Sequence, residues 1–177
     1  MEKIPIQIDT HMDVATFRAF SHFNSFKLNN RFITLALFPV VMFGLAVINA
    51  VTGSSLFFWL LISLGILLPS SYLIFYKVAM ERQITLHGLD TPKKVYSLIV
   101  NTKGLYITSQ TEKAHYRWNQ IYRLFVMDDS IYIYLTKARA FILPYKDFTQ
   151  GTPEELLALA QKNLPSVRLF DKCSKKD

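Results

Sequence analysis

The chain has 177 residues and a formal net charge of +7 at pH 7, a length that fits one modest soluble domain plus a short membrane segment. Cys173 is the single cysteine, which excludes an internal disulfide and a cysteine-based zinc cluster. The sequence contains no recognisable nucleic-acid-binding motif to accompany this positive charge. The charge is better explained by a domain held beside an anionic membrane surface.

The N-terminal segment predicts a strand followed by a helix. Isoleucines alternate with other residues over Lys3–Ile8, as in a short strand, and Pro5 favours an edge position. The residues Thr10–Asp13 resemble a capping box that opens a helix ending near Phe26. Phenylalanines recur every third residue along it, so this helix can pack on the cytoplasmic domain or lie in the membrane interface. Both alternatives stay open.

Two apolar runs, Phe32–Val51 and Leu56–Tyr76, contain no Asp, Glu, Lys, Arg or His. Each has about 20 residues, enough for a helix of roughly 30 Å that spans the hydrocarbon core of a bilayer. Helices buried in a soluble protein would usually show a polar stripe, and neither run has one. The turn Thr52–Ser55 is so short that the helices must be antiparallel neighbours. Gly44 and Gly65 can let them approach closely.

Basic residues flank this predicted transmembrane hairpin at both outer ends: Lys27, Arg31, Lys77 and Arg82. Because basic flanks are retained on the cytoplasmic side, both termini are predicted to be cytoplasmic. The apolar runs contain no ionisable residue, which argues against a two-helix transporter. The hairpin is therefore expected to be an anchor or a docking surface.

The sequence becomes strongly β after the hairpin. Six short runs joined by short turns predict an antiparallel meander: Val95–Asn101, Leu105–Ser109, Lys113–Trp118, Ile121–Met127, Ser130–Thr136 and Arg139–Leu143. In Ser130–Thr136 the aliphatic residues occupy one face, and Tyr132 and Tyr134 occupy the other. The two tyrosines are therefore expected to be exposed and to contact a partner.

A capping box at Thr152–Glu155, with Pro153 at the first helical position, predicts a helix to about Asn163. Its apolar face can cover the open end of a bent sheet. The fold class is therefore an α+β membrane protein with a two-helix hairpin and an antiparallel sheet capped by a C-terminal helix. The segments are a strand and amphipathic helix over 1–31, a hairpin over 32–76, a cytoplasmic domain over 77–170, and a polar tail over 171–177.

Few residues indicate chemistry. The four histidines fall in separate elements without ligand spacing, and no nucleophile–base pair is visible. The sequence therefore predicts no metal, no cofactor and no enzyme. Trp118 is predicted to anchor the core at a strand end, with stacking on a ligand as the alternative.

The order of elements and the stretch Trp118–Phe148 resemble the YcxB-like family of bacterial membrane proteins. Members carry a Trp followed by a polar pair and Ile, an acidic turn, an aromatic-rich strand, and an apolar strand ending in Pro with a basic residue and Phe soon after. The matching positions here are Trp118, Ile121, Asp128, Asp129, Tyr132, Tyr134, Ile142, Leu143, Pro144, Lys146 and Phe148. The resemblance implies a pleckstrin-homology-like fold and no established biochemical role. Gln83–Leu86 or Ile4–Ile8 would supply a further strand.

The sequence is compatible with two functions. The first is a non-catalytic protein of the bacterial cytoplasmic membrane that presents its pleckstrin-homology-like domain to a protein partner or an anionic lipid. By that resemblance, Lys93, Lys94 and Lys103, which flank the first strand pair, are candidate headgroup contacts. The alternative is an immunity protein that shields a membrane target from a toxin. A homo-oligomer is compatible with either function.

Overall fold

The computed structural model describes residues 5–53, 55–109 and 112–171. Contacts divide the chain into two compact units, one made of Met1–Asp13 and Thr91–Asp177, the other of Val14–Asp90. We call the first the β domain and the second the helical unit. This division differs from the predicted segments, because the first strand belongs to the β domain and the helix after it belongs to the helical unit. The predicted polar tail lies almost wholly outside the described residues.

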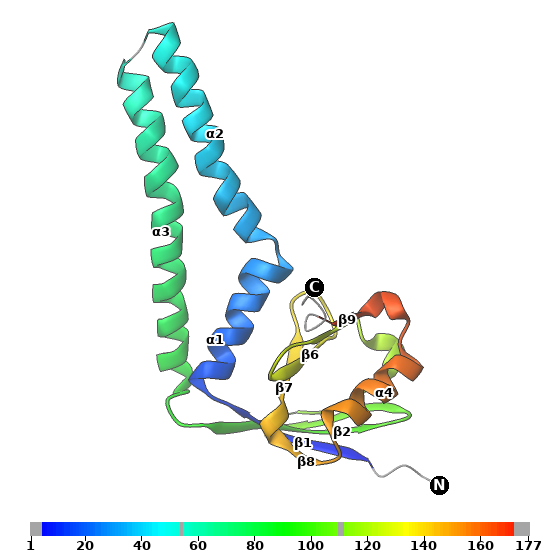
Figure 1. Ribbon diagram of the computed structural model, residues 1–177. Helices are drawn as coiled ribbons and strands as arrows, with labels where there is room; N and C mark the ends of the chain where they lie inside the picture. The colour runs from blue at the N-terminus through cyan, green and yellow to red at the C-terminus, as the bar shows by residue number, and fades with distance from the viewer. Residues whose placement is uncertain (1–4, 54, 110–111, 172–177) are drawn as a thin grey trace. The chain divides into compact units, whose positions relative to one another are not determined.

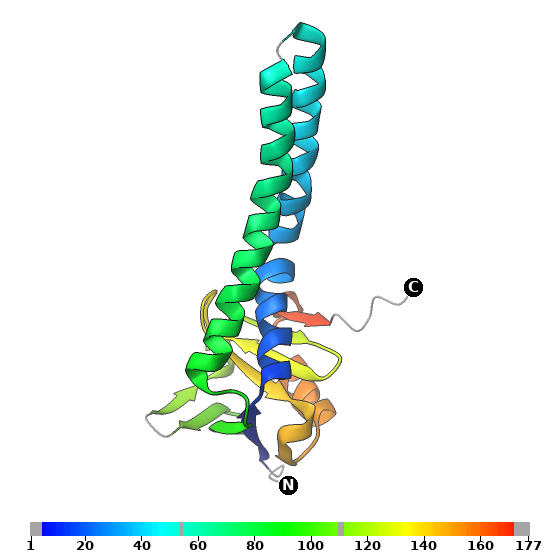
Figure 2. The ribbon, with the colours of Figure 1, turned by 90° about the vertical axis from the view of Figure 1, so that its left-hand side faces the viewer.

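Over residues 14–53 and 55–90, the helical unit contains three α-helices. They are α1 (Val14–His22), continued by a π-helical stretch (Phe23–Leu28), α2 (Arg31–Thr52) and α3 (Ser55–His87). The helices α2 and α3 run antiparallel and side by side (Figures 1 and 2). By length and composition, both are able to cross a membrane. Because α3 continues well past Tyr76, the strand considered at Gln83–Leu86 is wrong, and those residues are helical.

The two long helices touch closely at one of the two predicted glycines. A Cβ atom on Gly65 would lie 3.0 Å from the Cβ of Met42 on α2, so only a very small residue allows this approach. Nothing lies within 4 Å of the corresponding position on Gly44. The prediction was therefore right for Gly65 and wrong for Gly44.

The first helix contacts the far end of α3. The guanidinium of Arg18 pairs with the carboxylate of Glu81 at 2.6 Å. In the stretch after α1, the ring of Phe26 meets the edge of Tyr76 at a centroid distance of 4.9 Å. These contacts lie within the helical unit, so the N-terminal helix is part of the base of the hairpin.

In the described residues, the β domain holds nine strands and one α-helix. The strands are β1 (Ile6–Met12), β2 (Lys93–Asn101), β3 (Gly104–Ser109), β4 (Lys113–Tyr116), β5 (Arg123–Val126), β6 (Ser130–Tyr134), β7 (Ala140–Pro144), β8 (Phe148–Gln150) and β9 (Leu169–Asp171). They form a five-stranded sheet A in the order β4-β3-β2-β1-β8 and a four-stranded sheet B in the order β7-β6-β5-β9. All pairs are antiparallel except β5 with β9, which is parallel.

Strand β1 lies in the interior of sheet A. It pairs with β2 on one side and with β8 on the other, so the predicted edge position is wrong. Pro5 precedes the strand and does not interrupt the ladder. Thr10 is buried within β1 and does not cap a helix, because the strand continues to Met12. The predicted capping box at Thr10–Asp13 is therefore also wrong.

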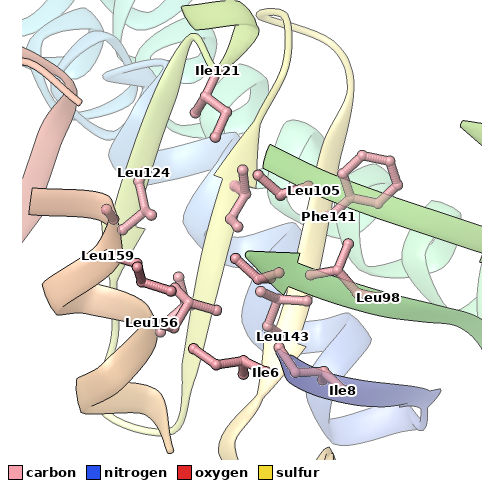
Figure 3. Packing of buried hydrophobic residues seen from close by; sticks show 14 of the residues in the cluster. Ile6, Ile8, Leu98, Leu105, Ile121, Leu124, Phe141, Leu143, Leu156 and Leu159 are labelled. Carbon is pink, nitrogen blue, oxygen red and sulfur yellow. The ribbon is translucent and has the colours of Figure 1, made fainter. Parts of the chain in front are cut away.

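The core of the β domain lies between the two sheets and the helix α4 (Pro153–Asn163), as Figure 3 shows. Ile6 and Ile8 of β1 meet Leu98 and Leu143 from the two sheets, and Leu156 of α4 points into the same cluster. The helix begins as predicted. The hydroxyl of Thr152 accepts from the backbone N–H of Glu155, and the Glu155 carboxylate accepts from the backbone N–H of Thr152.

One buried hydroxyl joins the two sheets. The Tyr96 hydroxyl on β2 donates to the carbonyl of Ile142 on β7 at 2.8 Å and accepts from the N–H of the same residue at 2.7 Å. The hydroxyl of Thr10 donates to that carbonyl at 3.4 Å. This pattern satisfies backbone groups on the open edge of β7, which would otherwise be buried without a partner.

Alkaline pH is expected to destabilise the β domain through Tyr96. Burial raises the pKa of Tyr96 above its usual value of about 10. The contribution of Tyr96 to the free energy of unfolding is therefore fully present below about pH 10 and is lost as the pH rises above it. Urea unfolding followed from about pH 8 to about pH 11 measures the slope, near 1.4 kcal/mol per pH unit for one buried tyrosine. The Tyr96→Phe variant should be less stable at neutral pH and have a shallower slope. An unchanged slope in that variant would assign the alkaline effect to another group.

Candidate functional site

The four flanking basic residues are exposed and lie within the helical unit. Lys27 lies in the π-helical stretch, Arg31 begins α2, and Lys77 and Arg82 lie on α3. The Arg31 guanidinium donates to the hydroxyl of Tyr72 at 3.2 Å, which places the start of α2 beside α3 about one turn before Lys77. The sequence has no Asp or Glu between Asp13 and Glu81. The base of the hairpin is therefore a cationic zone.

The chain leaves and re-enters the β domain at one place. Met12 at the end of β1 pairs with Lys93 at the start of β2, so the two connections to the helical unit start from adjacent strand ends. Two contacts fix this exit. The His11 N–H donates to the Asp147 carboxylate at 2.7 Å, and Lys146 forms an ion pair with Asp13.

The Lys146–Asp13 hydrogen bond also raises the pKa of Lys146, so the ammonium stays charged. In the sequence, Lys146 is distinguished only as the basic residue of the family motif. Its partner could not be predicted, because the pair joins residues that are distant in sequence. The His11–Asp147 and Lys146–Asp13 contacts therefore stabilise the end of β1 that leads to the helical unit.

The candidate lysines do not form one cluster. Lys94 lies near the start of β2 and pairs with Asp9 of β1 at 2.9 Å, while Lys103 is exposed in the turn after β2. The length of β2 separates them, roughly 25–30 Å at about 3.3 Å per residue. The side chain of Lys93 lies outside the part of the chain that the structure describes. A single phosphate site made from Lys94 and Lys103 is therefore excluded.

The prediction that Tyr132 and Tyr134 are exposed is wrong. Their side chains are 1% and 2% exposed, and all five residues of β6 are buried. The ring of Tyr134 meets the edge of Phe125 on β5 at 5.5 Å, and burial raises the pKa of both tyrosines. Sequence alternation placed them on the opposite face from the isoleucines, but a tyrosine ring is largely apolar and packs well in a second buried layer.

Trp118 is buried, as predicted for a core anchor, at 5% exposure. It begins a short 3-10 helix, Trp118–Gln120, between β4 of sheet A and β5 of sheet B. Its indole N–H donates to the backbone carbonyl of Asn101 at 3.0 Å. Asn101 in turn accepts from two backbone N–H groups of the β2–β3 turn. Trp118 therefore connects the joint between the sheets to that turn.

Sheet A has an outer face that the sequence pattern alone does not mark as a site. One row across it joins Gln7, Ile99, Tyr106 and His115 in neighbouring register positions. Tyr106 and His115 stack at a centroid distance of 4.1 Å, and Ile99 is 38% exposed. The alternation in β2, with Leu98 inside, would have placed Ile99 outside. We call this row the sheet A ridge.

Each histidine has a structural partner: His11 contacts Asp147, the His22 ring packs on Phe26, His87 hydrogen-bonds with Gln83, and His115 stacks on Tyr106. Within residues 5–53, 55–109 and 112–171, no three His, Cys, Asp or Glu side chains lie close enough together to hold a metal ion.

These features define a class of protein. It is an α+β chain in which two long apolar helices are inserted between adjacent strands of a two-sheet domain. Residues 100–160 match the family model described as YcxB-like protein, which confirms the resemblance to the YcxB-like family. The match covers about a third of the chain and contains the stretch Trp118–Phe148. Neither the curated proteins nor the solved structures gave a match.

Proposed function

We propose that the chain is a non-catalytic, membrane-anchored binding protein. Its helices α2 and α3 span the bacterial cytoplasmic membrane, and its β domain, with a pleckstrin-homology-like fold, binds a protein partner at the cytoplasmic face. The distribution of exposed apolar side chains carries the proposal. Among the described residues, every exposed large hydrophobic residue except Val95 and Ile99 lies on α2 or α3. Surfaces of this kind are unfavourable in water and mark a membrane or interface segment.

The spacing of aromatic and basic residues along α3 matches the thickness of a bilayer. Trp59 lies one turn after the start of α3, and Tyr76 lies about 25 Å further along the helix at about 1.5 Å per residue. The hydrocarbon core is about 30 Å thick, and Trp and Tyr are enriched at both of its interfaces. Lys77 follows immediately, so the basic end of α3 belongs on the cytoplasmic side.

The strand order supports the pleckstrin-homology-like assignment. Two antiparallel meanders, β2-β3-β4 and β5-β6-β7, follow each other in sequence and pack against one C-terminal helix. The N-terminal strand β1 extends the first meander, with the helical unit inserted after it. This arrangement presents the sheet A ridge as the candidate partner surface, in place of Tyr132 and Tyr134. An exposed Ile beside stacked aromatic rings is typical of a protein-binding surface.

Cysteine labelling tests the membrane location and orientation. In a Cys173→Ser chain, Ser55→Cys is expected to react with a membrane-impermeant maleimide on intact cells, because the short turn is outside. Lys103→Cys in the same background is the matched control and should react only after lysis. The reverse result would overturn the orientation. Release of the chain from membranes by alkaline carbonate would overturn the membrane anchor itself.

Photo-crosslinking tests the binding role. A photoreactive phenylalanine at Tyr106, in the full chain in its membrane, is expected to give one discrete protein adduct. The control is the same residue at Tyr122, which is also partly buried but lies outside sheet A. Lipid adducts alone at Tyr106 would overturn the protein-partner proposal. The absence of any adduct would also overturn it and leave the immunity hypothesis in its place.

A further inference from the structure

A groove of about 390 Å³ lies between α2 and α3 within the helical unit. Its walls are apolar and are formed by Leu35 and Phe38 of α2 and by Leu68 and Pro69 of α3. Arg31, Thr34 and Tyr72 also line it and add the polar groups of the site. The groove lies between the tight contact at Gly65 and the base of the hairpin. Figure 1 shows that α2 and α3 separate toward this base.

The polar end of the groove has a cation that its surroundings do not neutralise. Arg31 donates to the Tyr72 hydroxyl, and no acidic side chain among the described residues pairs with it. The sequence has no acidic residue between Asp13 and Glu81, and Glu81 is already paired with Arg18. A guanidinium has five N–H donors in a planar fork that matches phosphate oxygens. The groove therefore has charge complementarity to an anion.

The position of Arg31 defines what kind of anion can bind. It is the first residue of α2, directly before the charge-free apolar run, so it lies at the interfacial end of a membrane helix. Apart from Thr34 and Tyr72, the other residues that line the groove are apolar. A soluble anion would leave these walls unfilled. A phospholipid has both the phosphate and the acyl chain that such a site accommodates.

We propose that this groove binds one anionic phospholipid, with its phosphate against the Arg31 guanidinium and the Tyr72 hydroxyl. One acyl chain lies along Leu35, Phe38 and Leu68. The proposal rests on the membrane location proposed above, and it adds a specific lipid site to the anchor. Bound lipid supplies the negative charge that pairs with Arg31.

Native mass spectrometry of the full chain tests this site. The protein is reconstituted with an equimolar mixture of phosphatidylglycerol and phosphatidylethanolamine of identical acyl chains, then released from the membrane mimetic in the spectrometer. We expect one retained phosphatidylglycerol per chain. Arg31→Gln should lower the ratio of retained phosphatidylglycerol to phosphatidylethanolamine by roughly fivefold, the effect of one cation at an anionic surface. Leu35→Trp should lower retention of both lipids, because the larger ring fills the groove.

Lys77→Gln is the matched control, since it removes an exposed cation from the same unit outside the groove lining. An equal loss of selectivity in this variant would overturn the site in favour of diffuse attraction. Unchanged retention in both Arg31→Gln and Leu35→Trp would also overturn it. Failure of the membrane location is a separate result, because the unaltered chain would then not incorporate into the membrane mimetic at all. Circular dichroism of each variant confirms that its helices are intact.

Discussion

A fusion in which an Asn-Gly turn replaces the helical unit, between Met1–Asp13 and Thr91–Asp177, is expected to fold. The reason is the register of β1 and β2. Met12 pairs with Lys93, so the ends to be joined are already adjacent and antiparallel. A short loop with an Asn-Gly sequence closes such a hairpin. Cooperative urea unfolding and dispersed amide resonances would show the folded state.

The matched fragment Thr91–Asp177 alone is expected to remain unfolded. It lacks β1, which pairs on both sides within sheet A and buries Ile6 and Ile8 at 2% and 0% exposure. Each buried isoleucine contributes about 1.5–3 kcal/mol, and the strand also supplies the ladder between β2 and β8. Domains have only about 5–15 kcal/mol of total stability, so this loss is decisive. A folded fragment would show that β1 is dispensable. An unfolded fusion would show that the helical unit contributes to the β-domain core.

The role of β1 shows which strands and pairings the local sequence pattern could predict and which it could not. Alternation predicted β2 to β7 within a few residues, because each half-buried strand repeats its pattern over several positions. The strands β8 and β9 are only three residues long, too short for any period to show. The split into two sheets, and the parallel pairing of β9 with β5, depend on long-range contacts that no local signal contains.

The candidate site shows the same limit. The charge-free runs predicted both long helices, and the flanking rule selected Arg31. Its partner Tyr72 depends on the register between α2 and α3, which the sequence does not reveal. Tyr132 was misplaced because alternation separates the two faces of a strand but does not say whether the second face is covered. The distance between Lys94 and Lys103 required the observed strand length.

Replacing Trp118 with alanine is expected to destabilise the β domain by about 3–5 kcal/mol, the usual cost of removing a large buried aromatic side chain. Trp118 packs in the cluster that contains Ile121 and the buried face of α4, so its loss leaves a cavity where the two sheets and the helix meet. It also removes the donor to the Asn101 carbonyl. The cost should appear as a lower urea midpoint in the fusion described above.

Trp118→Phe is the control that separates packing from hydrogen bonding. It keeps an aromatic ring in the cluster but lacks the indole N–H, so its cost should be smaller, about 1–3 kcal/mol for the buried carbonyl left without a donor. Hydrogen exchange in the full chain gives an independent readout. Amides of the β2–β3 turn should lose protection in both variants, because Asn101 holds that turn and Trp118 holds Asn101. If Trp118→Ala keeps the stability of the unaltered protein, Trp118 does not anchor the core, and its indole is available for the alternative role of stacking on a ligand.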